Sequence, residues 1–290
     1  MSKQSGNRHK KSNTLIRSTL IAGLGLGLTA CASMGTEDGQ SFRLRANSHA
    51  LMQTSTADVE AEIEFGRDIA ARVLGRYGLL KDSPKNRYIS LIGTALAAHS
   101  NRTELSYHFA ILDSDKVNAY SAPGGYIFIT RGALALAEDE AELAAILAHE
   151  IAHISERHIV NALNIKATDK SAGAGIGRLL SAGTDTSRVA FFQAIDQAVA
   201  ILFEKGYSQQ DELDSDRVAT LLLAEAGYDP LALRRYLQRA QQADNQTGEI
   251  NTTHPPSRNR LQSLNRLIEE EQLDSLQLSK NKTRFEQHVD

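Results

Sequence analysis

The chain contains the stretch Ala148-His149-Glu150-Ile151-Ala152-His153, which follows the pattern His-Glu-x-x-His. On a helix, at about 100° per residue, histidines four positions apart lie on nearly the same face, so both imidazoles can reach one metal ion. Glu150 points to one side, where it can hold a water molecule and take its proton instead of binding the metal. The pattern indicates a zinc-dependent hydrolase site with one Zn²⁺ per chain.

The residues before this pattern predict that its helix is buried. Residues 141–148 are largely apolar, which disfavours the alternative of an amphipathic helix with the histidines on its wet face. Buried imidazoles and a buried carboxylate are costly unless they are paired or bound to metal. The surroundings therefore favour a metal site over a polar surface.

A catalytic zinc ion usually takes three protein ligands, and the third does not lie directly after the pattern. The metzincin motif is excluded because Glu156 replaces its glycine and Ile159 replaces its third histidine. His158 comes one residue early. Nine steps of about 100° place His158 across the helix from His149, which favours a structural role or a contact with a ligand.

The stretch from Tyr207 to Ala219 offers a better third ligand. It is an acidic helix start that runs into an apolar stripe, with Glu212 and Asp216 four positions apart on one face. Glu212 could bind the metal while Asp216 accepts the free N–H of a ligating histidine. The alternative is a charged, solvated helix face. Two histidines and a distant glutamate form a ligand set known for catalytic zinc.

Several further motifs accompany these residues in a fixed order. They are Asn118-Ala119-Tyr120-Ser121-Ala122-Pro123-Gly124-Gly125-Tyr126-Ile127-Phe128-Ile129-Thr130-Arg131-Gly132, then Glu142-Leu143-Ala144, the zinc pattern, Arg157-His158, Glu212 with Asp216, and Thr253-His254-Pro255 with Arg260. Over roughly residues 55 to 268 the chain resembles the gluzincin metallopeptidases related to HtpX, BepA and the CAAX-prenyl proteases, in particular their periplasmic lipoprotein branch.

This resemblance implies an α+β fold: a mainly helical zincin-type metalloprotease domain with a small sheet bordering the active-site cleft. It assigns His149, His153 and Glu212 as the zinc ligands, Glu150 as the general base and Asp216 as the carboxylate behind a ligating histidine. One departure is Ser208-Gln209, where relatives often carry Ser-Arg before the ligand glutamate. The membrane helices of multi-pass members and the helical-repeat tail of BepA are not evident in this sequence.

Three short strands are predicted, at residues 106–112, 117–121 and 126–130. Pro123-Gly124-Gly125 marks a turn between the last two and has two interpretations. It is a simple hairpin connection, or the following strand borders the cleft and pairs with an extended substrate backbone. The resemblance favours the second, with a substrate-binding set formed by Asn118, Gly124, Gly125, Tyr126, Ile127 and Phe128.

Helical spacing predicts helices over residues 56–80, 88–98 and 189–203, with Pro84 in the connection between the first two. Residues 161–200 include the glycine-rich runs 172–177 and 181–185. We expect these runs to be loosely structured and to form a lid or loop beside the cleft.

His254, followed by Pro255-Pro256, starts a further predicted helix. Turns favour polar residues, so it could be a surface turn residue. The alternative is a catalytic role in the cleft. There it would donate to the oxyanion of the tetrahedral intermediate, or it would occupy the open position of the metal in a resting form.

The first 31 residues have the pattern of a bacterial lipoprotein signal. Basic residues precede the apolar run Leu20–Leu28, and Leu28-Thr29-Ala30-Cys31 resembles a lipobox cleaved before a lipid-modified cysteine. Cys31 is the single cysteine, which suits acylation. With Ala32 after it, the resemblance to Gram-negative lipoproteins implies an outer-membrane lipoprotein facing the periplasm, anchored in lipid through acylated Cys31.

The predicted organisation is a signal peptide at residues 1–30, a lipid-anchored tether at 31–54, a zinc metallopeptidase domain at 55–271 and a C-terminal tail at 272–290. Without residues 1–30, the chain keeps 27 basic and 35 acidic side chains, a net charge of −8. This charge disfavours nucleic acid as a partner.

The predicted function is a zinc-dependent endopeptidase that cleaves unfolded or misassembled proteins, since pairing with a strand requires a locally unfolded substrate. The main alternative is a chaperone-like lipoprotein that binds outer-membrane polypeptides, with cleavage secondary or latent. A weaker alternative is hydrolysis of a non-peptide amide. Glu150 favours catalysis, because binding alone needs no general base. The sequence leaves the oligomeric state open.

Overall fold

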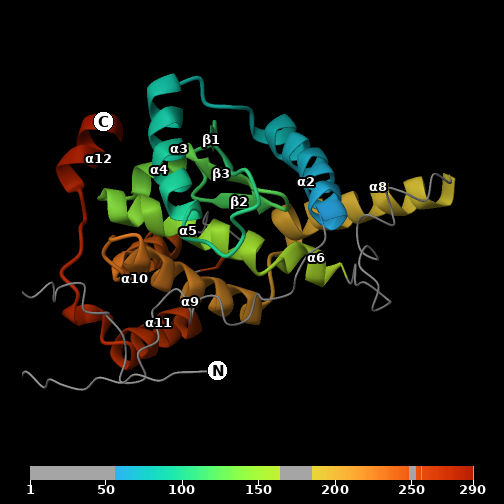
Figure 1. The fold of residues 1–290 in the computed structure, drawn as a ribbon. Helices are drawn as coiled ribbons and strands as arrows, with labels where there is room; N and C mark the ends of the chain where they lie inside the picture. The colour runs from blue at the N-terminus through green and yellow to red at the C-terminus, as the bar shows by residue number, and fades with distance from the viewer. Residues whose placement is uncertain (1–55, 164–184, 248–252, 256, 290) are drawn as a thin grey trace, which may run out of the picture. The chain divides into compact units, whose positions relative to one another are not determined.

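The computed structural model describes residues 56–163, 185–247, 253–255 and 257–289. The predicted signal peptide, Cys31, the tether and the glycine-rich run 172–177 lie outside these ranges. Figure 1 shows the elements: α2 (Thr56–Tyr77), α3 (Ser83–Ala97), β1 (His108–Leu112), β2 (Ala119–Ala122), β3 (Tyr126–Thr130), α4 (Arg131–Leu136), α5 (Glu140–Ser155), α6 (His158–Ala162), α8 (Asp185–Ala200), the π-helix η1 (Ile201–Lys205), α9 (Gln209–Glu225), α10 (Ala232–Thr247), α11 (Arg258–Glu270), the 3₁₀-helix η2 (Leu273–Ser275) and α12 (Lys282–Val289).

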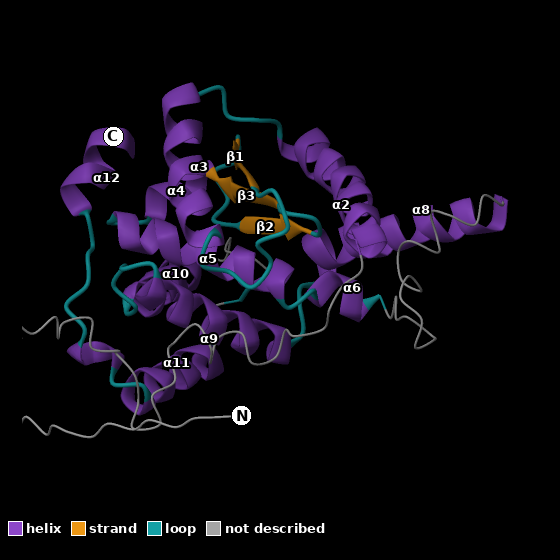
Figure 2. Cartoon of the chain, viewed as in Figure 1, coloured by secondary structure: helices purple, strands orange, loops and turns teal. Residues whose placement is uncertain are grey.

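The prediction of a mainly helical α+β fold with a small sheet is confirmed (Figure 2). Each described helix is too short or too polar to cross a lipid bilayer. The predicted helix at 189–203 is present as α8 and η1. The glycine-rich runs 172–177 and 181–185, which we expect to be loosely structured, lie outside the described ranges except for Asp185, so that expectation stays a prediction. Residues 158–162 and 185–200 are helical, and the intervening residues 164–184 lie outside the described ranges.

In the described part of the chain, the sheet has three strands in the order β1-β3-β2. The central strand β3 pairs in parallel with β1 and antiparallel with β2. Both edges of β3 are therefore hydrogen-bonded, and β2 is an edge strand. This corrects the expectation that Tyr126, Ile127 and Phe128 form the strand to which a substrate adds, because a strand paired on both sides cannot accept another.

The Pro123-Gly124-Gly125 turn between β2 and β3 is held against α2. Gly124 and Gly125 have φ of 77° and 103°, in the region that favours glycine. A Cβ on Gly124 would lie 2.5 Å from Ile63 Cα, and one on Gly66 would lie 1.6 Å from the Pro123 carbonyl oxygen. The backbone of α2 therefore touches the backbone of the turn, which fixes where β2 ends and β3 begins.

Pro84 lies in the first turn of α3 and not in the connection before it. Asp82 is the N-cap residue, and its side chain accepts a hydrogen bond from the Lys85 N–H at 3.0 Å. Proline is tolerated in a first turn because its missing N–H would have no partner within the helix. The prediction therefore began this helix too late, at residue 88 instead of at Ser83.

Helix α5, which carries the zinc pattern, is buried along its whole length. It packs against α9, α3 and α10 and against strand β2. In Figure 1 it lies between the sheet and the orange helices α9 and α10. The Asp139 side chain caps its start by accepting from the Glu142 N–H. The helix ends at Ser155, and Arg157 turns the chain with a left-handed φ of 57°.

The first turn of α5 carries buried carboxylates that are neutralised from two later helices. Glu142 pairs with Arg239 of α10 at 2.6 Å, and Glu140 pairs with Arg284 of α12. The Phe285 side chain of α12 is 4% exposed. Residues of the predicted C-terminal tail at 272–290 therefore pack on the domain and hold the start of α5.

Candidate metal centre

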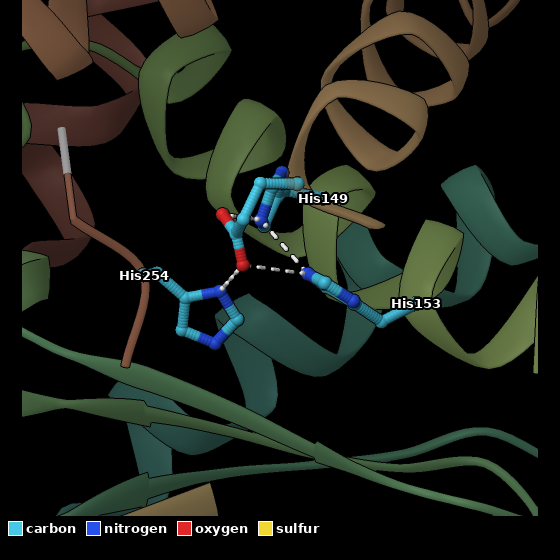
Figure 3. A group of neighbouring side chains, drawn as sticks. His149, His153 and His254 are labelled. Carbon is cyan, nitrogen blue, oxygen red and sulfur yellow. Dashed lines mark hydrogen bonds and ion pairs between the residues drawn. The ribbon is translucent and has the colours of Figure 1, made fainter. Parts of the chain in front are cut away.

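His149 and His153 point in the same direction from α5, as their spacing predicts (Figure 3). Their Nε2 atoms lie 3.1 Å apart, and both side chains are buried. Two imidazoles whose nitrogens approach so closely need a proton or a cation between them. This pair is the centre around which the other side chains gather.

Glu212 reaches the pair from α9. Its Oε2 lies 3.5 Å from His149 Nε2, and its Oε1 lies 3.6 Å from His153 Nε2. Ser208 starts α9 with a capping box, accepting from the Asp211 N–H while the Asp211 side chain accepts from the Ser208 N–H. The polar residues before Glu212 therefore serve the helix start, and the alternative that Glu212 lies on a solvated face is wrong, because its side chain is 3% exposed.

His254 lies in the same site. Its Nδ1 is 2.8 Å from Glu212 Oε1, and its Nε2 is 3.8 Å from Glu150 Oε1. Ligand atoms of His149, His153, Glu212 and His254 all lie within 4.8 Å of one another. The structure thus places His254 facing the site, and its side chain is 8% exposed, unlike that of a surface turn residue.

Both histidines of α5 are held through their second ring nitrogens. His149 Nδ1 lies 3.0 Å from Asp216 Oδ1, where the sequence placed this carboxylate. His153 Nδ1 lies 2.9 Å from His158 Nδ1. The helical count for His158 fails because α5 ends at Ser155, so the chain folds back toward His153. His158 nonetheless contacts a predicted ligand, as one of the two expected roles requires. Such contacts fix the tautomer and the ring orientation of a ligand.

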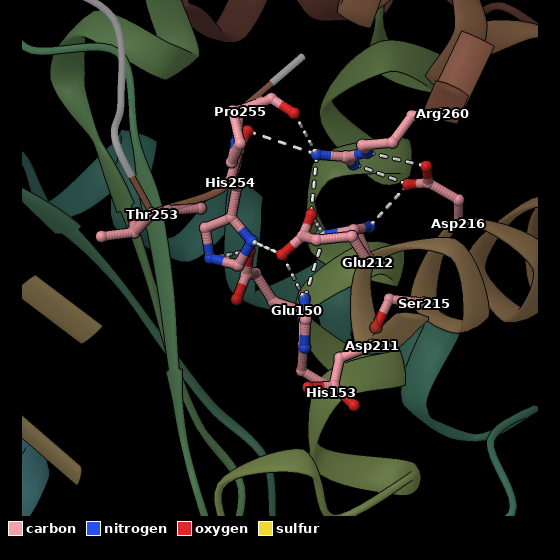
Figure 4. A network of polar contacts seen from close by, with 12 residues as sticks. Glu150, His153, Asp211, Glu212, Ser215, Asp216, Thr253, His254, Pro255 and Arg260 are labelled. Carbon is pink, nitrogen blue, oxygen red and sulfur yellow. Dashed lines mark hydrogen bonds and ion pairs between the residues drawn. The ribbon is translucent and has the colours of Figure 1, made fainter. Parts of the chain in front are cut away.

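The site contains two residues, Arg260 and Tyr207, to which the sequence analysis assigned no role. The Arg260 guanidinium, on α11, donates to both Asp216 oxygens at 2.8 and 2.6 Å and lies 2.7 Å from Glu212 Oε2 (Figure 4). The Tyr207 ring stacks on His153 with centroids 3.9 Å apart. In the sequence, Arg260 stands in the motif after His254, and Tyr207 stands just before the N-cap of α9. Neither position tells which residue the side chain contacts.

The buried charges of the site shift its protonation equilibria. Burial favours neutral carboxyls, but the charges of His254 and Arg260 outweigh it and hold the pKa of Glu212 well below its ordinary value. Burial and neighbouring His149 lower the pKa of His153 well below the ordinary value. Burial also lowers the pKa of His149, but hydrogen bonds to Asp216 and Glu212 outweigh it and raise that pKa to about 9. A metal ion that binds His149 has to displace its proton.

The residues present fit a divalent metal ion. Zinc–nitrogen bonds of about 2.0–2.1 Å in a tetrahedron separate ligand atoms by roughly 3.3 Å, and the separations of 3.1 to 3.6 Å among the two imidazoles and Glu212 bracket that value. The buried Oε2 of Glu150 and Nε2 of His254 have no hydrogen-bond partner among the described residues. Two unsatisfied polar atoms beside three donor groups are typical of a site built for an ion and water.

The predicted substrate-binding residues do not lie together at the site. Asn118 lines a cavity beside His149, and its side-chain N–H donates to Thr253 Oγ1 at 3.3 Å. Ile127 and Phe128 belong to the hydrophobic core. Gly124 and Gly125 are packed against α2 and against Ser106. Of this set, the structure brings only Asn118 to the site, because the others serve the turn and the central strand.

A buried helix with two metal-facing histidines, joined by a glutamate from a later helix of a mainly helical α+β domain, defines a gluzincin-type metallopeptidase. Residues 83–268 match the family described as peptidase family M48, and the chain belongs to this family. The predicted membership of the gluzincin family of HtpX and BepA type is thereby confirmed.

Relatives of the chain include peptidases from bacteria and mitochondria. The chain is 26% identical over 272 residues to the beta-barrel assembly-enhancing protease of Escherichia coli strain K12, covering 88% of this chain and 52% of that protein. It is 29% identical over 188 residues to a putative beta-barrel assembly-enhancing protease of Vibrio cholerae, covering 64% and 39%. It is 27% identical over 224 residues to the mitochondrial metalloendopeptidase OMA1 of Schizosaccharomyces pombe, covering 74% and 64%. The chain spans about half the length of the first of these relatives.

Proposed function

We propose that the chain is a zinc-dependent endopeptidase with one zinc ion per chain. The observation that carries the proposal is the meeting of His149, His153 and Glu212 around one point, with the Glu150 carboxylate buried beside them. Relatives named as metalloendopeptidases support the same activity.

His149, His153 and Glu212 would hold the zinc ion. A bound zinc ion supplies Lewis acidity and lowers the pKa of water toward neutrality. Glu150 takes the proton of the attacking water on its unpartnered Oε2 and passes it to the leaving amine. His254 Nε2, which has no hydrogen-bond partner among the described residues, donates to the oxyanion of the tetrahedral intermediate. Asp216 and Arg260 keep His149 and Glu212 in place.

We propose that the substrate is an extended, locally unfolded polypeptide. The edge strand β2 packs against α5 and is the nearer candidate for pairing with a substrate backbone. A folded protein has its backbone groups already paired, so cleavage requires unfolded or misassembled targets. The name of the Escherichia coli relative, which refers to beta-barrel assembly, supports substrates that are β-barrel polypeptides.

The proposed location is the periplasmic face of the outer membrane of a Gram-negative bacterium. The support is the sequence of residues 1–31, which ends in the lipobox-like Leu28-Thr29-Ala30-Cys31. Radiolabelled palmitate should label the full chain in cells, and Cys31→Ser should abolish the label. Equal labelling of both would reject acylation at Cys31.

A second candidate function is that of a chaperone-like lipoprotein with latent cleavage. The observation that favours it is His254, whose Nδ1 lies among the four donor groups and would occupy the position that an attacking water needs. In that arrangement the site binds metal without turning over, and the same edge strand would hold a polypeptide without cutting it.

The deciding experiment measures zinc content and cleavage of one polypeptide in its folded and unfolded forms. Wild type should contain one zinc ion and cleave the unfolded form faster, while Glu150→Gln should retain zinc and lose cleavage. Turnover retained by Glu150→Gln would remove Glu150 from its role, and equal rates for the two substrate forms would reject the preference for unfolded targets. Zinc-loaded wild type that binds the unfolded form without cutting it would favour the second candidate.

A further inference from the structure

A buried ion-pair network joins α2 to the end of α5. Its centre is Glu62 of α2, whose side chain is 1% exposed. Each Glu62 oxygen accepts from the Arg102 guanidinium at 3.3 Å, and Oε2 lies 3.2 Å from Arg157 Nη2. Glu62 Oε1 also accepts from the Gly124 N–H at 3.4 Å. One carboxylate therefore connects α2 with the loop before β1, with the turn after β2 and with the chain that leaves α5.

The charges of this network balance within the protein. Arg102 is buried and pairs with a second carboxylate, that of Glu104. Together with Glu62 and Arg157, the network holds two positive and two negative charges. Removing the charge of Glu62 would leave an excess positive charge in a buried place, and a buried charge is stable only with a partner.

Arg157 occupies the corner between α5 and α6. Helix α5 ends at Ser155, and Arg157 has a left-handed φ of 57°, which is uncommon for a residue with a Cβ. Arg157 is the N-cap residue of α6, yet its side chain makes no capping hydrogen bond. The guanidinium reaches Glu62 instead. The ion pair therefore holds the chain at the point where its direction changes.

The residue after this corner contacts a candidate metal ligand. His158 begins α6, and its Nδ1 lies 2.9 Å from His153 Nδ1. Two residues of α9 also contact the His158 ring: Ser215 Oγ lies 3.4 Å from Nδ1, and Asp211 Oδ1 lies 3.8 Å from Nε2. These contacts orient the ring, whereas the position of the His158 backbone depends on the corner at Arg157.

Glu62 and Arg157 line one small cavity together with His153, so the ion pair lies close to the metal centre. We propose that Glu62 is a positioning residue for the zinc site: by holding Arg157, it fixes the corner that places His158 on His153. The proposal rests on the zinc site of the proposed function and adds a residue from α2 to it.

The expected effect is a loss of zinc affinity. Groups that contact a metal ligand change metal affinity by about 10- to 100-fold when they are removed, and Glu62 acts through two intervening residues, so we expect about tenfold. Glu62→Gln keeps the size of the side chain and removes its charge. Arg157→Asn should cause the same loss, because asparagine tolerates the left-handed backbone and the variant therefore removes the ion pair without straining the turn.

The test measures the zinc dissociation constant of the full chain by competition with a chelating dye, for wild type, Glu62→Gln, Arg157→Asn and the double variant. If Glu62 acts through Arg157, the double variant should also lose about tenfold, whereas independent effects would multiply to about 100-fold. Glu64→Gln is the matched control, since it is the same substitution at an exposed position of α2 and should leave the zinc affinity unchanged.

Circular dichroism establishes that each variant is folded at the temperature of the titration. If Glu62→Gln does not fold, Arg157→Asn still tests the corner. A zinc affinity equal to that of wild type in every folded variant, or losses that multiply in the double variant, would overturn the proposal. A wild type that binds zinc but cleaves nothing would instead refute the endopeptidase function, and the comparison of affinities would still decide the role of Glu62.

Discussion

Gly66→Ala should destabilise the protein even though alanine is the better helix former. A Cβ at Gly66 would lie 1.6 Å from the Pro123 carbonyl oxygen, whereas ordinary contacts begin at 3.4 Å. Helix α2 and the turn before β3 would have to separate by roughly 1.8 Å to admit the methyl group. Both sides of this contact are backbone, so no side-chain rotation can relieve the overlap.

Two opposing free energies decide the outcome. Replacing glycine by alanine inside a helix stabilises by about 0.5–1 kcal/mol. Overpacking costs about 1–3 kcal/mol even where side chains can move. We therefore expect a net loss of about 1–2 kcal/mol, which lowers Tm by about 2–4 °C per kcal/mol for a domain of this size.

Gly75 in the same helix provides the matched control, because nothing lies within 4 Å of a Cβ built there. Gly75→Ala should raise Tm, while Gly66→Ala should lower it. The assay is thermal unfolding of the zinc-loaded chains followed by circular dichroism at 222 nm. A Tm that rises by the same amount in both variants would refute the close packing of α2 on the turn.

Three further predictions concern the buried charges. Arg260→Gln should lower both stability and zinc affinity, because removing one partner of a buried ion pair costs about 3–5 kcal/mol; unfolding and zinc titration check this, and unchanged zinc affinity would contradict it. Burial raises the pKa of Glu140, but hydrogen bonds from Arg284, Tyr88 and Tyr228 outweigh it and hold that pKa below its usual value. Ionised Glu140 therefore stabilises the folded state fully above the ordinary pKa of a glutamate, and this stabilisation is lost as the pH falls through the lowered pKa. The free energies of unfolding of wild type and Glu140→Gln, measured with urea, should differ by about 1–3 kcal/mol at neutral pH and become equal in acid. A difference that does not change with pH would show that the charge of Glu140 is not its cause. His254→Ala should retain zinc and change kcat by about 10²- to 10³-fold. The value of kcat should fall if His254 donates to the oxyanion, and it should rise if His254 occupies the open position of the metal. Kinetics and zinc content that both match wild type would show that His254 has no role in the site.

The metal centre could be predicted further than the sheet, for a physical reason. His149 and His153 lie within one helix, where the repeat of 3.6 residues fixes their relative directions. Glu212 and Asp216 share a face of α9 by the same rule. Local spacing therefore predicts which residues of each helix belong to the site. That the two halves meet around one point could not follow from spacing, and the resemblance supplied that assignment.

The sheet order and Arg260 were beyond such reasoning. Tyr126 to Phe128 have the pattern of a strand whether it is central or at an edge, because order depends on which strands meet after the chain folds back. Arg260 lies 44 residues beyond Asp216, and a single arginine in a helix gives no sign of a distant partner. His158 shows the limit of helical counting, which fails beyond the end of a helix, here Ser155.

The pairing of Glu140 with Arg284 constrains the order in which the domain folds. The first turn of α5 keeps an uncompensated buried carboxylate until α12, which carries a residue 144 positions later, has packed against it. A chain folded only as far as α9 already contains both histidines and Glu212, yet the helix that positions them still lacks this counter-charge. We therefore expect the active site to be among the last parts of the domain to reach its final geometry.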